Sequence, residues 1–72
     1  MLYWKRKVNI SNYVYYRSES YDTLLQYYNN YYRKWEDNIV TMTQKKEFLG
    51  NTIQEVSKEE VDNYIVMQEL QA

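Results

Sequence analysis

Three short segments of the sequence interleave aromatic rings with cations: residues 3–7, 15–17 and 31–35. Single-stranded nucleic acids are bound by this combination, because rings stack on bases and cations neutralise phosphates. If the first seventeen residues form strands, alternation places five of these side chains, together with Tyr13, on one exposed face, and nucleic-acid binding is then an alternative function. The six residues are Tyr3, Lys5, Lys7, Tyr13, Tyr15 and Arg17.

The residue types that usually carry catalysis are missing. The chain has no His, no Cys and one Gly, so it offers no thiolate, no imidazole base and no Gly-rich phosphate loop. Two carboxylate clusters, at residues 36–37 and 59–62, flank expected helix ends, where we expect them to be solvated. We therefore predict no enzyme activity and no catalytic, cofactor-binding or metal-binding residue.

Tyrosine is the most unusual component, with 10 residues in 72. Tyr is enriched at protein interfaces, because its ring brings contact area and its hydroxyl brings a hydrogen bond. The favoured function is therefore a small non-catalytic module that binds another protein. The abundance of residues with A+T-rich codons suggests an accessory protein of a phage or mobile element. Such a protein would bind and modulate, by inhibition, a host protein.

A chain of 72 residues forms one domain, residues 1–72, with a small core. Without Cys it has no disulfide to support that core, so self-association, as a homodimer, is the expected supplement. No apolar run approaches the ~18 residues of a membrane span, and the first residues do not resemble a signal peptide. We expect no membrane partner and a cytoplasmic location.

Charge is divided unevenly along the chain. Residues 1–34 carry six basic and two acidic side chains, a net charge of 6 − 2 = +4, whereas residues 35–72 carry three and eight, a net of 3 − 8 = −5. The halves either complement each other, within one fold or across a dimer, or present a basic aromatic face to a polyanion.

Residues 2–17 alternate with the period of a β-strand, with apolar side chains at even positions from Leu2 to Tyr16. Because Asn and Ser cluster at residues 9–12, we expect a turn there and a β-hairpin around it. Residues 20–36 instead match the period of a helix, with a stripe of Tyr, Leu and Trp from Tyr21 to Trp35 and Ser20 as N-cap.

Residues 38–56 favour one or two strands, with Gly50-Asn51 as a hairpin loop and residues 45–47 as a competing turn. Ser57 and Glu60 then form a capping box, and Val56 and Val61 a hydrophobic staple, at the start of a helix over residues 58–70. This helix is apolar on two sides. Val61, Tyr64 and Ile65 share one side, and the other, the predicted protein interface, carries Val66, Met67 and Leu70.

These elements together predict an α+β fold. A small antiparallel sheet of three or four strands packs against the amphipathic helix of residues 20–36, and a second, C-terminal helix packs beside it. The open question at this point is whether the second side of the C-terminal helix meets another chain or its own core.

Overall fold

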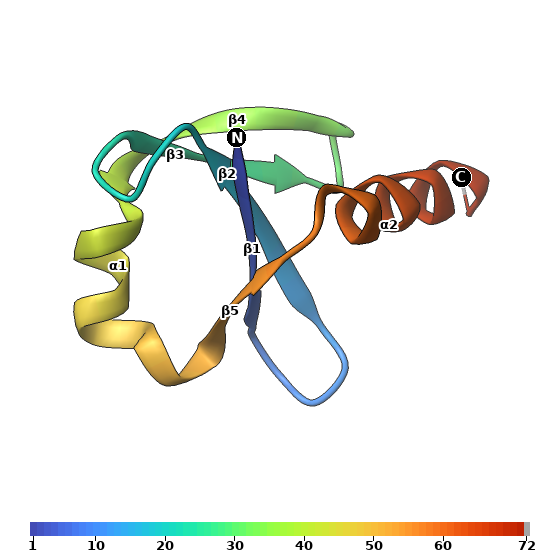
Figure 1. Ribbon diagram of the computed structural model, residues 1–72. Helices are drawn as coiled ribbons and strands as arrows, with labels where there is room; N and C mark the ends of the chain where they lie inside the picture. The colour runs from blue at the N-terminus through green and yellow to red at the C-terminus, as the bar shows by residue number, and fades with distance from the viewer. Residues whose placement is uncertain (72) are drawn as a thin grey trace.

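The computed structural model describes residues 1–71 and has an α+β fold with a single sheet. The elements, in chain order, are β1 (Leu2–Lys7), β2 (Tyr13–Ser18), β3 (Leu24–Asn29), β4 (Lys34–Thr41), α1 (Met42–Leu49), the single 3₁₀ turn η1 (Gly50–Thr52), β5 (Ile53–Val56) and α2 (Lys58–Leu70). The sheet has five antiparallel strands, and Figure 1 shows the helices α1 and α2 on opposite sides of it.

The sheet has the strand order β4-β3-β2-β1-β5, in which every neighbouring pair is antiparallel. The first four strands follow one another as a meander. The chain then passes through α1 and η1 and returns to pair β5 with the far side of β1. The expectation of three or four strands is therefore too low.

The predicted hairpin over residues 2–17 is confirmed. β1 and β2 pair antiparallel, and the loop between them closes where Asn9 Oδ1 accepts hydrogen bonds from the amides of Ser11 and Asn12, at 3.1 and 3.0 Å. An Asn side chain that bonds the backbone two and three residues ahead stabilises a turn without glycine. The polar cluster at residues 9–12 thus ends β1 and begins the return strand.

The predicted helix over residues 20–36 is wrong. This segment forms β3, a turn and the start of β4. Asn29 Oδ1 accepts from the amides of Tyr31 and Tyr32, at 2.9 and 3.1 Å, and Arg33 takes a positive φ of 57° to complete the turn. Since Tyr also favours strands, the tyrosines that suggested a helix stripe are equally compatible with two paired strands.

The segment between residues 38 and 56 is only partly a strand. Residues 39–41 extend β4 as expected, but Thr41 then caps α1, with its side chain accepting from the Gln44 amide and the Gln44 side chain accepting from the Thr41 amide. This reciprocal pair is a capping box and fixes the helix start. Gly50-Asn51 belongs to η1 and does not form a hairpin loop.

The C-terminal helix is confirmed with its predicted bounds, Lys58–Leu70. Ser57 is its N-cap and accepts a hydrogen bond of 3.1 Å from the Glu60 amide. The Glu60 carboxylate does not close the capping box, because it forms an ion pair of 3.0 Å with Lys5. This ion pair ties the first turn of α2 to strand β1.

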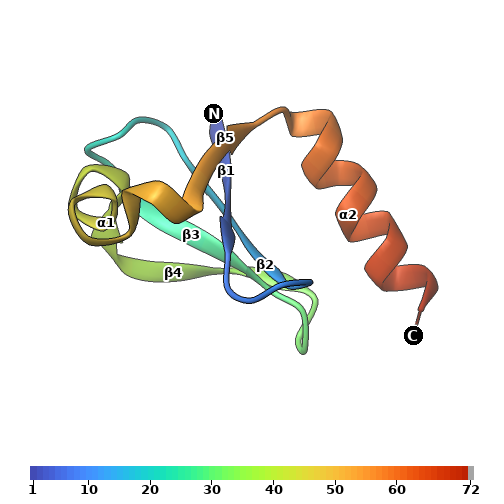
Figure 2. The same ribbon diagram turned by 90° about the horizontal axis from the view of Figure 1, so that it is seen from below.

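Both faces of the sheet are covered, so the core has two parts (Figure 2). Under α2, a first cluster contains Tyr3, Tyr15, Tyr28 and Val61. On the opposite face, a second cluster, beside α1, is made by buried Trp4, Tyr16, Leu25 and Met42. Consecutive residues of a strand point to opposite faces. Adjacent pairs such as Tyr3-Trp4 and Tyr15-Tyr16 therefore supply both clusters.

Candidate functional site

The six residues of the predicted nucleic-acid face do share one face of the β1–β2 hairpin. They form three directly opposed pairs across the two strands, in which each ring faces a cation. The pairs are Tyr3 with Arg17, Lys5 with Tyr15, and Lys7 with Tyr13. The alternation of the sequence thus placed these six side chains correctly relative to one another.

The expectation that this face is exposed is wrong for most of its length, because α2 lies across it. Tyr3 and Tyr15 are buried against the helix. The guanidinium of Arg17 stacks 4.3 Å from the centre of the Trp35 ring, and its Nε donates to Gln26. With Lys5 paired to Glu60, two of the three cations already have partners within the chain.

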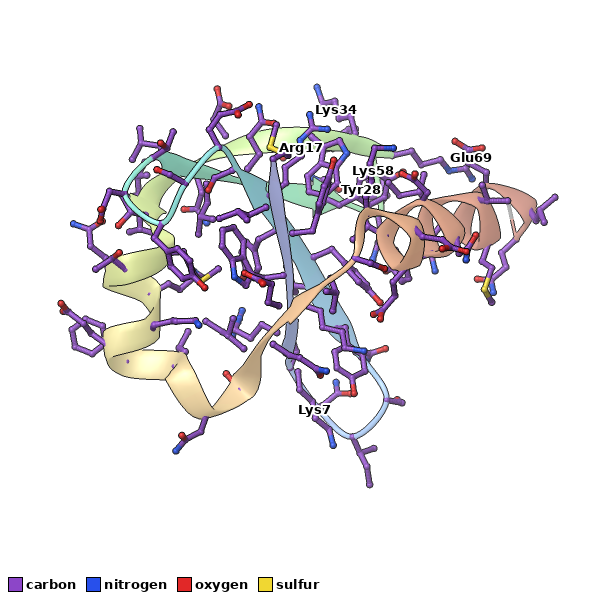
Figure 3. The ribbon with its side chains drawn as sticks, viewed as in Figure 1. Lys7, Arg17, Tyr28, Lys34, Lys58 and Glu69 are labelled. Atoms are coloured by element: carbon purple, nitrogen blue, oxygen red, sulfur yellow. The ribbon has the colours of Figure 1, made fainter. Side chains whose placement is uncertain are left out.

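Lys7 and Tyr13 lie where the hairpin extends beyond α2. Figure 3 shows Lys7 at the loop end of β1, far from Arg17 and Lys34 at the other end of the sheet. A hollow of about 400 Å³ opens here between the hairpin and the segment before and within β5. None of the described residues that line this lysine hollow is a carboxylate; they are Lys5, Lys7, Val8, Asn9, Tyr13, Asn51, Thr52, Ile53 and Gln54.

A second and larger hollow, of about 640 Å³, lies between β2, the hairpin loop and α2. Its volume falls within the range of about 300–1,000 Å³ that is typical of binding pockets. We call it the amide cleft, because five of its eleven residues are Asn or Gln. Its lining is Val8, Asn9, Ser11, Asn12, Tyr13, Val14, Tyr15, Asn30, Tyr64, Gln68 and Gln71.

The tyrosines of the amide cleft form the outer end of an aromatic cluster under α2. The rings of Tyr15 and Tyr64 stack with centroids 4.3 Å apart, and Tyr28 meets Tyr64 edge to face at 6.4 Å. Burial raises the pKa of Tyr15, as it does that of Tyr28. Both phenols therefore stay protonated and neutral at physiological pH.

The predicted protein interface lies on the outer side of α2. Val66, Met67 and Leu70 are 52%, 57% and 79% exposed, whereas Val61 on the inner side is 1% exposed. The alternative in which the helix is buried on both sides within its own chain is therefore excluded. Of the two apolar sides of this helix, one packs against the sheet and the other faces solvent.

Comparison of the chain with protein-family models, curated proteins and solved structures finds no match. Within residues 1–71, no group of three or more acidic side chains is arranged to hold a metal ion. None of the helices in this range is long and apolar enough to cross a membrane.

Sequence reasoning did not anticipate the amide cleft. The sequence predicts a turn at residues 9–12 and places Tyr64 on one side of the last helix with Val61 and Ile65, but no pattern in the sequence brings these two segments together. Asn30 and Gln68 carry no signal of their own, and Asn30 lies in a segment that matches a helix that does not form. The cleft exists because the crossing of α2 over the sheet brings these residues together.

Proposed function

We propose that this chain is a non-catalytic module that binds another protein through the end of the molecule formed by the β1–β2 loop and the amide cleft. The observation that carries the proposal is the composition of this surface. Tyr and Asn make up six of the eleven residues that line the cleft, and none of the described lining residues is charged. Antibody binding sites are also rich in Tyr and Asn, because Tyr supplies rigid contact area and Asn supplies adaptable hydrogen bonds.

The loop adds an apolar anchor to this polar surface. Ile10 is 92% exposed at the hairpin loop, beside Val8, which is 50% exposed. The Asn9 side chain holds the loop in a fixed turn, so little conformational entropy is lost when a partner binds it. A projecting apolar residue beside a hydrogen-bonding cleft resembles the central anchor and polar surround of protein interfaces.

The partner's identity is a finer proposal that rests on composition. A host protein modulated by an accessory protein of an A+T-rich phage or mobile element fits a short, tyrosine-rich chain. Inhibition is the simplest effect of such a small protein, because it can block a functional surface of its partner by binding there, without catalysing a reaction.

Affinity capture from a lysate of the gene's host tests the proposal. The immobilised chain should retain one host protein, and Ile10→Asp should abolish the retention. Ile39→Asp is the matched control, because Ile39 is 89% exposed but lies on β4, at the opposite end of the sheet from the loop (Figure 1). Retention that Ile39→Asp abolishes and Ile10→Asp leaves intact would refute this placement of the binding surface.

Single-stranded nucleic acid is the second candidate, and the lysine hollow favours it. Lys7 and Tyr13 line the hollow, and Lys7 has no ion pair among the described residues, whereas the neighbouring Lys5 is paired with Glu60. Binding of this kind weakens steeply with salt, because phosphate counterions are released. Charge reversal at Lys7 should then abolish a gel shift seen at low salt, and an unmodified protein that gives no shift would end this alternative.

A further inference from the structure

The amide cleft presents hydrogen-bonding groups that the chain itself does not use. Within the described residues, no hydrogen bond is made by the hydroxyls of Tyr13, Tyr15 and Tyr64. The same holds for the side-chain amides of four of its residues, each of which can donate two hydrogen bonds and accept two. These are Asn12, Asn30, Gln68 and Gln71.

Among the described residues, no ionised side chain lines the cleft, which argues against ligands that are held by charge. Lys5, whose ammonium lies against the Tyr13 ring, is 3.0 Å from the Glu60 carboxylate. A phosphate or carboxylate entering this space would lose its hydration without meeting an opposite charge. The groups present favour a ligand that is uncharged and rich in both donors and acceptors.

Each ring in the cleft already packs against a neighbour within the chain, which leaves less ring surface for ligands that stack. Tyr15 and Tyr64 stack on each other, and the ammonium of Lys5 lies 4.8 Å from the centre of the Tyr13 ring. Nucleobases and sugar rings are held mainly by open aromatic faces. Here the hydroxyls and amides remain available instead, and they suit a ligand whose polar groups repeat along a line.

We propose that the amide cleft binds an extended, uncharged polypeptide segment of the partner protein, with its main-chain N–H and C=O groups bonded to the amides and hydroxyls of the cleft. This inference rests on the proposed protein-binding function and adds the chemistry of the segment that is recognised. Along an extended chain, N–H groups that donate hydrogen bonds and C=O groups that accept them follow one another at regular spacing. Asn and Gln side chains can match both kinds of group.

The test is selection from a random octapeptide display library on the purified protein. Enriched peptides should be uncharged, and their affinity should change less than about twofold between 50 and 500 mM salt, since no ion pair forms. Gln68→Ala and Tyr64→Phe should each weaken binding roughly 2- to 12-fold, the effect of one hydrogen bond. Asn63→Ala is the matched control, because it removes an exposed amide from the outer side of the same helix and should leave affinity unchanged.

N-methylation of the selected peptide at one main-chain nitrogen after another should weaken binding at the positions that donate into the cleft. Tyr64 packs in the core as well as lining the cleft, so the Gln68→Ala variant carries the test if Tyr64→Phe is unstable. Charged or salt-sensitive peptides, or affinity that Gln68→Ala leaves unchanged, would overturn the inference. So would an empty selection, or binding of neutral oligosaccharides in place of peptides.

These outcomes are separable from the fate of the proposed function. If a host protein is captured through Ile10 but no uncharged peptide is enriched, the chain is a protein-binding module whose cleft is not the recognition site. If neither experiment yields a binder, both proposals fall together.

Discussion

Arg33 is the residue at which the backbone is most constrained. It is the non-glycine position with a positive φ, 57°, among the residues that the structure describes. The left-handed conformation costs an L-residue roughly 1–2 kcal/mol, because its Cβ crowds the following carbonyl. The turn keeps this geometry because the Arg33 amide donates to the Asn29 carbonyl at 2.7 Å.

Arg33→Gly should therefore raise the free energy of unfolding by about 0.5–1 kcal/mol, since glycine adopts this conformation without the Cβ clash but loses more entropy on folding. Arg33→Ala is the control, because alanine removes the side chain and keeps the clash. Denaturant melts of the three proteins measure the difference. A rise with alanine that equals the rise with glycine would show that the Arg33 side chain, and not the backbone, is responsible.

Glu36 joins the two strands on either side of this turn. Its carboxylate accepts hydrogen bonds from Asn29 Nδ2, at 3.0 Å, and from the Tyr27 hydroxyl, at 2.7 Å. These two hydrogen bonds, that from Asn29 first, hold the pKa of Glu36 below its ordinary value, with a smaller contribution from Lys34. The charged form is thus the one that the fold prefers.

A carboxylate whose pKa is lower in the folded than in the unfolded protein stabilises the fold fully at pH values above its ordinary pKa, about 4.3. That stabilisation is lost as the pH falls through the pKa of the folded protein. The free energy of unfolding should fall in acid, and Glu36→Gln should make the fall shallower. Glu19 is the control, because it is exposed and has no partner among the described residues. Thermal melts from pH 7 to pH 3 that show equal slopes for Glu36→Gln and the unmodified protein would contradict this role.

At the scale of elements, the adjacent residues Leu24 and Leu25 distinguish a strand from a helix. A helix stripe would bury both, but β3 places Leu25 in the core at 1% exposure and leaves Leu24 57% exposed. Leu25→Ala should destabilise the protein by about 2–5 kcal/mol, because it opens a cavity beside Trp4 and Met42. Leu24→Ala should cost less than about 1 kcal/mol. Similar losses from the two substitutions, measured by denaturant unfolding, would contradict the strand.

Elements are predicted correctly from the sequence where the local pattern agrees with the packing of the whole fold. Alternation over residues 2–17 and the cap at Ser57 both gave the correct structure, because the hairpin and α2 follow their local patterns. Residues 20–36 failed because Tyr suits strand and helix alike, and their turn uses Asn29 and Arg33 without glycine or proline. Thr41 was read as part of a strand, so its capping box with Gln44 was missed.

The candidate site was less predictable than the fold. Alternation along the sequence is enough to predict the residues that share a face of the hairpin. The element that covers this face depends instead on contacts between segments far apart in the sequence. The crossing of α2 buried Tyr3 and Tyr15, and the same crossing created the amide cleft beside them. Exposure of an aromatic residue in a sheet with two apolar faces cannot be read from strand periodicity alone.

At the scale of the whole molecule, the surfaces most able to pair with a second copy are the sheet edges and the outer side of α2. Strand β4 is one edge, but its register shifts opposite Leu24 and Gln26, and the Asn38 side chain accepts a hydrogen bond of 2.7 Å from the Ile39 amide. Irregularities of this kind protect an edge against pairing with another strand. The outer side of α2 has no such protection.

We therefore propose that the protein self-associates as a two-fold dimer through Val66, Met67 and Leu70. These side chains lie in the last turns of α2 and are exposed, whereas Val61 on the same helix packs in the cluster against the sheet. Three side chains cover much less than the ~800 Å² per partner of a stable interface, so the dimer should form only at micromolar concentrations or above. Closed two-fold pairing is the commonest arrangement among homo-oligomers.

Light scattering on a sizing column should give a mass near twice 9.0 kDa at high micromolar concentration. Because the two side chains are exposed, Met67→Glu combined with Leu70→Glu should yield a folded monomer, whereas Ile39→Glu, on β4, should leave the dimer intact. Circular dichroism verifies folding in each case.

A monomeric unmodified protein at that concentration would refute the dimer. An unfolded double variant would contradict the exposure of these side chains, and a dimer that survives both substitutions would place the contact elsewhere.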